Sequence, residues 1–117
     1  MVRRRARISL LLLLSAFHTI GACARPLAKD PLAAGIAAAR EDRWEEAVQY
    51  WKQALEHGPD SAAIHNNLAV AYEKLGAFKD AGHEYEAALG LDPSNSEIKE
   101  NYESFKLRLE AARRMRP

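Results

Sequence analysis

Cys23 is the residue of this 117-residue chain with the most distinctive chemistry, because it is the single thiol. With one cysteine, no disulfide can form within the chain. The cysteine follows four arginines between residues 3 and 7 and an apolar run from Ile8 to Phe17. A basic start, a short apolar stretch and small residues at its end are typical of a secretory signal. The run of about ten residues is too short to cross a hydrocarbon core of roughly 30 Å. An uncleaved membrane anchor or an unstructured tail is the alternative.

The residues around the cysteine indicate what becomes of its thiol. Ile20, Gly21, Ala22 and Cys23 resemble the lipobox of bacterial lipoproteins. The resemblance implies a diacylglycerol on the Cys23 thiol, cleavage before Cys23, and acylation (a palmitate, for example) of the new amino group. Two or three acyl chains together give a stable membrane anchor. Ala24 after the cysteine implies the outer membrane of the bacterial cell envelope, facing the periplasm. Ordinary cleavage after Ala24 remains an alternative.

The other reactive side chains do not form a recognisable catalytic or metal site. His57, His65 and His83 have no second ligand at a useful spacing, so we expect no metal. No serine lies in a G-x-S-x-G turn, and no glycine-rich loop could hold a phosphate. We therefore expect no enzyme, no catalytic residues and no cofactor.

The charge balance argues against nucleic acid as a partner. The chain has 17 basic and 16 acidic residues, and four of the basic ones precede residue 25. Residues 25–117 therefore contain 13 basic and 16 acidic residues, which gives this segment a net charge of −3. Such a segment has no basic stripe with which to neutralise phosphates. The basic residues that remain gather at the C-terminus, where they complement a helix dipole or contact an anionic lipid or an acidic partner.

The chain also repeats itself after 34 residues. Ala47, Trp51 and Pro59 correspond to Ala81, Tyr85 and Pro93. Residues 28–61 and 62–95 resemble two tetratricopeptide repeats, each a pair of antiparallel helices. The second copy matches the family pattern better than the first, in which Pro31, Ala34 and Ala38 replace a Trp, a Leu and a Tyr. The resemblance implies an all-α fold, a short right-handed α-solenoid of two helix pairs followed by a C-terminal capping helix.

This organisation divides the chain into four parts. They are a lipoprotein signal peptide at 1–22, a lipidated N-terminus and linker at 23–30, two repeats at 31–95, and a capping helix with a basic tail at 96–117. Helices are expected near 31–42, 44–57, 61–75, 78–91 and 95–114. Asp30 before Pro31 predicts a helix start, and the residues from Ser94 to Glu97 fit a capping box. Small residues at Gly35, Ala47, Ala69 and Ala81 should let the helices approach closely, with Trp51 and Tyr85 filling the space beside them.

The last predicted helix has an apolar face of Ile98, Tyr102, Phe105 and Leu109 and a polar opposite face. It therefore looks like the terminal cap that a solenoid requires. At least three repeats are usually needed for stability. Two repeats and a cap leave open the alternative of self-association or of a stabilising partner.

The family resemblance also implies a binding groove, because the first helix of each pair lines a concave surface. Carried over by position, the groove residues are Leu32, Ile36, Asn66, Asn67, Val70, Glu73, Glu97, Glu100 and Asn101, with Ala39 and Ser104 beside them. Some relatives use an asparagine at the position of Asn67 to hold a peptide's terminal carboxylate. Leu32, Ile36 and Glu97 stand where that clamp needs polar or basic residues, so we expect it to be absent. An extended or helical segment with apolar and basic side chains fits this groove better. It would place aliphatic side chains on Leu32 and Ile36, and cations near the acidic residues Glu73, Glu97 and Glu100.

Together these features predict an envelope-anchored protein–protein interaction module, an adaptor or assembly factor. Its expected partners are a protein or peptide on the repeat surface and the membrane through the lipid anchor. The alternative is a structural accessory subunit of an outer-membrane, pilus or secretion complex, which would bind through the convex face.

Overall fold

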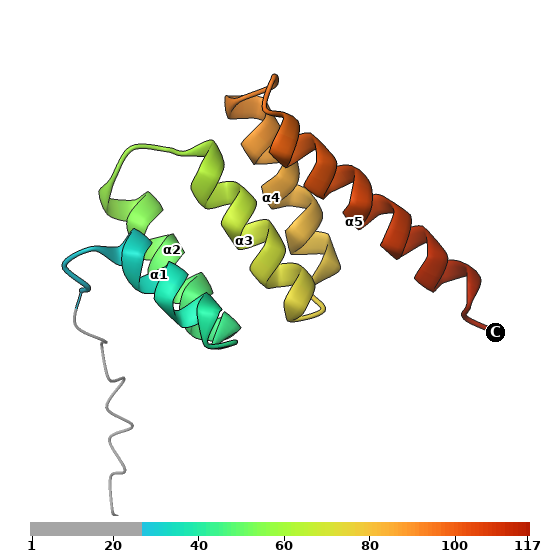
Figure 1. Ribbon diagram of the computed structural model, residues 1–117, viewed down its shortest axis with the longest axis horizontal. Helices are drawn as coiled ribbons and strands as arrows, with labels where there is room; N and C mark the ends of the chain where they lie inside the picture. Colours follow the sequence, from blue (N-terminus) through green and yellow to red (C-terminus); the bar gives the residue numbers. More distant parts are fainter. Residues whose placement is uncertain (1–26) are drawn as a thin grey trace, which may run out of the picture.

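The computed structural model describes residues 27–117, which form five α-helices joined by short turns (Figure 1). In order, the helices are α1 (Pro31–Arg40), α2 (Trp44–His57), α3 (Ala62–Lys74), α4 (Phe78–Leu91) and α5 (Ser96–Arg114). All five agree with the ranges expected from the sequence to within two residues at each end. The described residues contain no strand, which confirms the all-α fold class.

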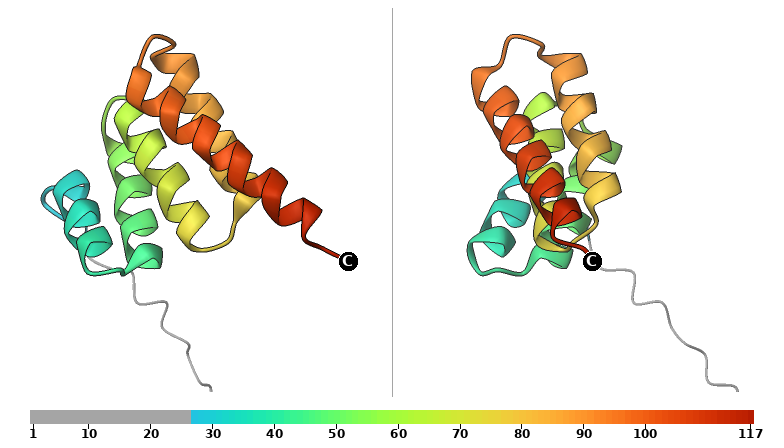
Figure 2. Two further views of the ribbon diagram at one scale, coloured as in Figure 1. Left: turned by 45° about the vertical axis from the view of Figure 1, so that its right-hand side comes forward. Right: turned by 90° about the vertical axis from the view of Figure 1, so that its right-hand side faces the viewer.

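The helices are arranged as two pairs and a single helix. In Figure 1, α1, α3 and α5 follow one another from left to right, with α2 and α4 behind them. The right-hand view of Figure 2 shows α1 and α5 on one side of the molecule and α4 on the other. The result is the predicted short α-solenoid, in which α1, α3 and α5 share one face.

The helices of the first pair approach closely because one of them carries a glycine. A Cβ atom added to Gly35 of α1 would lie 2.3 Å from Nε1 of Trp51, on α2. Trp51 is only 3% exposed and packs with Ala38, Ala47 and residues of α3 in one core cluster. In the first pair, the structure therefore confirms the prediction that a small residue lets the two helices approach closely.

The second pair shares its core with α5. Ala69, Ala81 and Tyr85 are fully buried and pack against Ile98 and Phe105. The ring of Tyr85 lies 5.6 Å from that of Phe105, centroid to centroid, and is tilted by 40° to it, within the distance range at which aromatic pairs attract each other. The predicted capping role of α5 is confirmed for its first half.

The helix ends follow local chemistry, with two departures from expectation. The Asp30 carboxylate accepts a hydrogen bond from the Ala33 amide at 3.0 Å, as expected of an N-cap. However, α1 ends at Arg40 and not at 42, because Asp42 takes a left-handed backbone conformation with φ of 57°. The expected capping box at 94–97 was also wrong. Asn95 caps α5 through the Ile98 amide, and the Ser94 hydroxyl donates to Asp92 instead.

Candidate functional site

A cavity of about 370 Å³ opens between α1, α3 and α5, on the face that these three helices share. Six of the nine predicted groove residues line it: Ile36, Asn66, Asn67, Val70, Glu97 and Asn101. They come from three helices and are brought together because each occupies the same side of the first helix in its repeat. The wall is mixed, with aliphatic side chains, carboxamides and one carboxylate. Such a lining can hold an apolar side chain and also bond a peptide backbone.

The carboxamides in this cavity differ in whether they are already hydrogen-bonded within the protein. Asn101 donates a hydrogen bond from Nδ2 to Oδ1 of Asn66 at 3.2 Å, which ties α5 to α3. Asn66 is only 7% exposed, so its role is largely structural. Asn67 is half-buried and makes no hydrogen bond through its side chain within residues 27–117. Its carboxamide is therefore the one best placed to bond an incoming segment.

Glu73 lies in the neighbouring cavity, and its carboxylate is already engaged. It accepts a hydrogen bond from the Tyr85 hydroxyl at 2.6 Å and one from Nη2 of Arg108, also at 2.6 Å. Burial, and then the hydrogen bond to Glu73, raise the pKa of Tyr85 well above its ordinary value of 10.0. Glu73 was predicted to receive a cation from a partner. The structure gives it an internal cation, so its contacts join α3, α4 and α5.

Two other predicted residues lie outside the 370 Å³ cavity. Leu32 is 38% exposed and lines a separate hollow of about 570 Å³ with Ala54 and Ile64. Glu100 is exposed on α5 and lines neither this cavity nor the hollow beside Leu32. Leu32 therefore offers an apolar surface at the start of α1, at a distance from the polar part of the groove.

The sequence did not identify three residues that line the groove, Arg40, Trp44 and Trp51. Arg40 follows Ile36 by four residues on α1, a spacing that could have revealed it. Trp44 packs half-buried against the first core cluster. One edge of it remains at the groove, with Nζ of Lys74 5.8 Å from the ring centroid. The guanidinium-bearing Arg40 and the ring of Trp44 therefore line the groove on the α1 side.

His65 forms a bridge on the other side of α3. Its Nδ1 lies 2.6 Å from a carboxylate oxygen of Glu84, and its Nε2 lies 2.7 Å from one of Asp60. Burial of the ring lowers the pKa of His65. The two carboxylates together outweigh this effect, so the net pKa is raised above the ordinary value of 6.5. Within residues 27–117 no group of three His, Cys, Asp or Glu side chains could hold a metal ion. The bridge joins the turn before α3 to α4.

Cys23, the proposed lipidation site, and the predicted signal peptide lie outside the described residues. Within the part of the chain that the structure describes, no helix combines the length and the apolar character needed to cross a bilayer.

Comparison with known proteins gives a family match over most of the helical region. The tetratricopeptide repeat family model matches residues 32–96, more than half of the chain. A segment of 55 residues is 33% identical to Hsp70-Hsp90 organizing protein 3 of Arabidopsis thaliana, covering 47% of this chain and 10% of that protein. A segment of 58 residues is 40% identical to protein O-mannosyl-transferase TMTC4 of Mus musculus, covering 50% of this chain and 8% of that protein. The chain thus spans a tenth or less of the length of these relatives.

Proposed function

Because the chain belongs to the tetratricopeptide repeat family, we propose that it is an envelope-anchored adaptor or assembly factor that binds a segment of a partner protein. Tetratricopeptide repeats are protein–protein interaction modules, and repeat stacks of this kind use a concave face for binding. The proposal adds the location of the binding site, the kind of segment bound and the attachment to the membrane. It assigns the chain no catalytic step.

The cavity between α1, α3 and α5 is the observation that carries the proposal. Ile36, Val70 and Trp44 give it apolar walls that suit an aliphatic side chain. The free carboxamide of Asn67 can donate to a backbone carbonyl and accept from a backbone amide. Glu97 offers a carboxylate for a lysine or an arginine at one end. The proposed ligand is therefore an extended or helical segment with an aliphatic anchor and a nearby basic residue.

The relatives support the class of function and do not identify the partner. The Arabidopsis relative is named as an organizing protein of Hsp70 and Hsp90. In this chain Leu32 and Ile36 occupy the positions where a carboxylate clamp needs polar or basic groups, and Arg40 is the only basic residue that lines the cavity. We therefore propose recognition of an internal segment, not of a terminal carboxylate.

The binding test uses the full chain in its native membrane. Replacing Asn67 by a photoreactive amino acid should give a crosslinked partner that mass spectrometry identifies, whereas the same replacement at Gln49 should not. Gln49 is exposed on α2, away from the groove. Alanine at Leu32, Ile36 and Asn67 together should abolish capture.

The opposite pattern would identify the accessory-subunit alternative. If the crosslink forms from Gln49 and the triple alanine variant captures its partner normally, then the convex face is the binding surface. A crosslink from Gln49 to a second copy of the chain would show self-association through that face instead. Each of these results rejects the groove as the primary binding site.

The membrane anchor has its own test because it rests on the residues up to Cys23 and not on the groove. Metabolic labelling with a fatty acid should label the protein, and Cys23→Ala should remove both the label and the association with membranes. A native chain that stays unlabelled would overturn the anchor while leaving the groove proposal intact. Fractionation of the envelope then tests the proposed outer-membrane location.

A further inference from the structure

The second half of α5 separates from the rest of the array. Ile98 and Phe105 in the first part of the helix are buried, but the helix continues to Arg114 with its last turns exposed. Figure 1 shows this end of α5 projecting beyond α4. A cavity of about 660 Å³ opens where α5 diverges from the C-terminal end of α3 and the start of α4. We refer to it as the α5 cleft.

The floor of the α5 cleft is apolar and partly aromatic. Its apolar lining residues are Val70, Phe78, Tyr85, Phe105, Leu109 and Ala112. Phe78 is 44% exposed, unusual for a phenylalanine whose ring centroid lies 6.4 Å from that of Phe105. An incoming apolar side chain would cover the exposed part of Phe78 and remove it from water.

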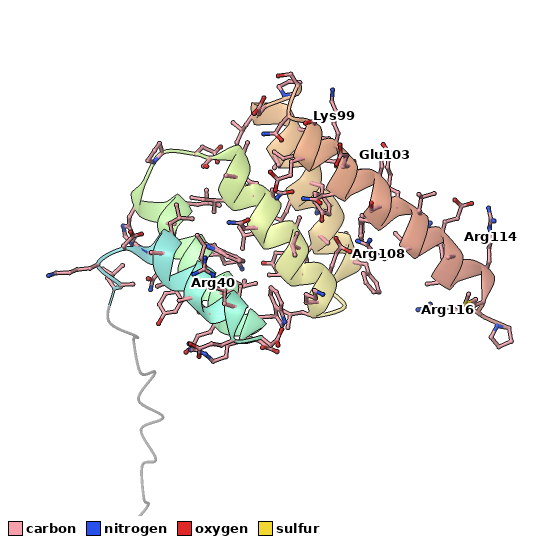
Figure 3. All side chains as sticks on the ribbon, in the orientation of Figure 1. Arg40, Lys99, Glu103, Arg108, Arg114 and Arg116 are labelled. Atoms are coloured by element: carbon pink, nitrogen blue, oxygen red, sulfur yellow. The ribbon has the colours of Figure 1, made fainter. Side chains whose placement is uncertain are left out.

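The rim of the α5 cleft is positively charged. Glu73 is the only carboxylate among the residues that line the cleft, and Arg108 is bonded to it. Lys74 also lines the cleft, and Arg113 follows Leu109 by four residues on the same side of α5. Figure 3 shows Arg108 on the edge of α5 that faces the cleft, and Lys99 and Glu103 on the other edge. The net positive charge of the rim complements an acidic ligand.

From this combination we propose that the α5 cleft binds an acidic amphipathic helix of a partner protein. Leucine or aromatic side chains on one face of that helix contact Phe78, Phe105 and Leu109. Carboxylates beside this face pair with Lys74 and Arg113. A helix laid into an apolar groove is a common mode of peptide recognition. This surface adjoins the groove of the proposed function, with which it shares Val70 and Asn101, but its aromatic floor and basic rim belong to it alone.

The test uses the full chain and three labelled synthetic peptides in fluorescence anisotropy. The first peptide is helical, with leucines spaced three and four residues apart and glutamates elsewhere. The second has lysine in place of each glutamate, and the third has the composition of the first in scrambled order. The acidic amphipathic peptide should bind saturably, and the other two should bind at least about tenfold more weakly.

Two variants and a matched control locate the site. Arg113→Glu should weaken binding of the acidic peptide by about five- to tenfold, with an effect that shrinks at high salt. Lys99→Glu makes the same charge change on the opposite edge of α5 and should leave binding unchanged. Phe78→Ala should weaken binding by about tenfold or more, provided that circular dichroism shows the native helix content.

Three outcomes would overturn the proposal. They are no saturable binding of the acidic peptide up to about 1 mM, equal binding of the lysine peptide, and equal loss of binding in Lys99→Glu and Arg113→Glu. Vesicles of anionic lipid provide a further arm. If they bind in an Arg113-dependent way while the acidic peptide does not, the basic end of α5 contacts a membrane and the cleft is not a protein site. Variants at Asn67 should change none of these measurements, which separates this surface from the groove.

Discussion

The replacement Gly35→Ala tests the packing of the first helix pair most directly. The added Cβ would lie 2.3 Å from Nε1, 2.5 Å from Cδ1 and 2.7 Å from Cε2 of Trp51. Ordinary contacts between such atoms are about 3.5–4.0 Å. The indole or the backbone of α1 must therefore move by roughly 1 Å. The ring has little room to do so, because Trp51 is almost completely buried.

Two opposing terms set the size of the effect. Alanine is favoured over glycine inside a helix by about 1 kcal/mol. Overpacking a core usually costs about 1–3 kcal/mol and sometimes more. Because the new methyl group would meet three atoms of a rigid ring, the overpacking cost of Gly35→Ala should lie at or above the upper end of that range. The expected net result is a loss of about 2 kcal/mol in the free energy of unfolding, a Tm lower by on the order of 10 °C for a domain of this size.

Gly82 supplies the matched control within α4. A Cβ at Gly82 would meet its nearest heavy atom, Cε1 of Phe105, at 3.7 Å, which is an ordinary contact. Gly82→Ala should therefore keep the helix-propensity gain and raise the stability by up to about 1 kcal/mol. Urea unfolding of both variants, followed by circular dichroism at 222 nm, would measure the two changes under the same conditions.

Opposite signs for the two alanine variants are the central expectation. Equal stabilisation by Gly35→Ala and Gly82→Ala would refute the packing argument. A double-mutant cycle adds a second check, because Trp51→Leu removes the ring that the new methyl group meets. In that background Gly35→Ala should lose most of its cost, which gives a coupling energy of about 1–3 kcal/mol.

Three further predictions concern polar contacts. His65→Gln should lower the stability more at pH 5.5 than at pH 8. Because the pKa of this bridging histidine is raised in the folded state, its contribution to stability is fully present below pH 6.5 and is lost as the pH rises through the folded-state pKa. Urea titrations at both pH values measure the loss. An equal loss at the two pH values would contradict the prediction. Asp30→Ala should cost about 1 kcal/mol by thermal unfolding, whereas Ser61→Ala should change the stability little, because the Ser61 side chain makes no cap hydrogen bond to α3. Tyr85→Phe should cost about 1 kcal/mol in urea unfolding, because it removes one donor from Glu73; an unchanged midpoint would show that Arg108 alone satisfies that carboxylate.

The helices and their pairing could be predicted from the sequence because they follow from short-range rules. Asp30 and Pro31 mark a helix start, and the 34-residue spacing assigns each small or aromatic residue to a place in the repeat. Departures arose where local groups compete. The Ser94 hydroxyl bonds Asp92, which leaves the cap of α5 to Asn95.

The composition of the candidate site could be predicted less completely. Position in the repeat brought Ile36, Asn67 and Glu97 to one cavity, since it fixes which side of a helix faces the groove. Repeat position does not fix long-range pairing. The contact between Glu73 and Arg108 joins residues 35 positions apart and depends on the angle at which α5 crosses α3. That contact removes a charge that the sequence pattern had assigned to the groove.

The packing of Gly35 against Trp51 also limits the order in which the two repeats can exchange residues during evolution. The second repeat places Ala69 and Tyr85 at the corresponding positions. The larger ring, Trp51, therefore occurs with glycine, and the smaller ring of the second repeat occurs with alanine. A lineage that converts the first pair to the second type must replace the tryptophan before the glycine. The reverse order passes through a clash in the core. Single substitutions therefore connect the two kinds of pair through an intermediate with glycine and tyrosine, and not through one with alanine and tryptophan.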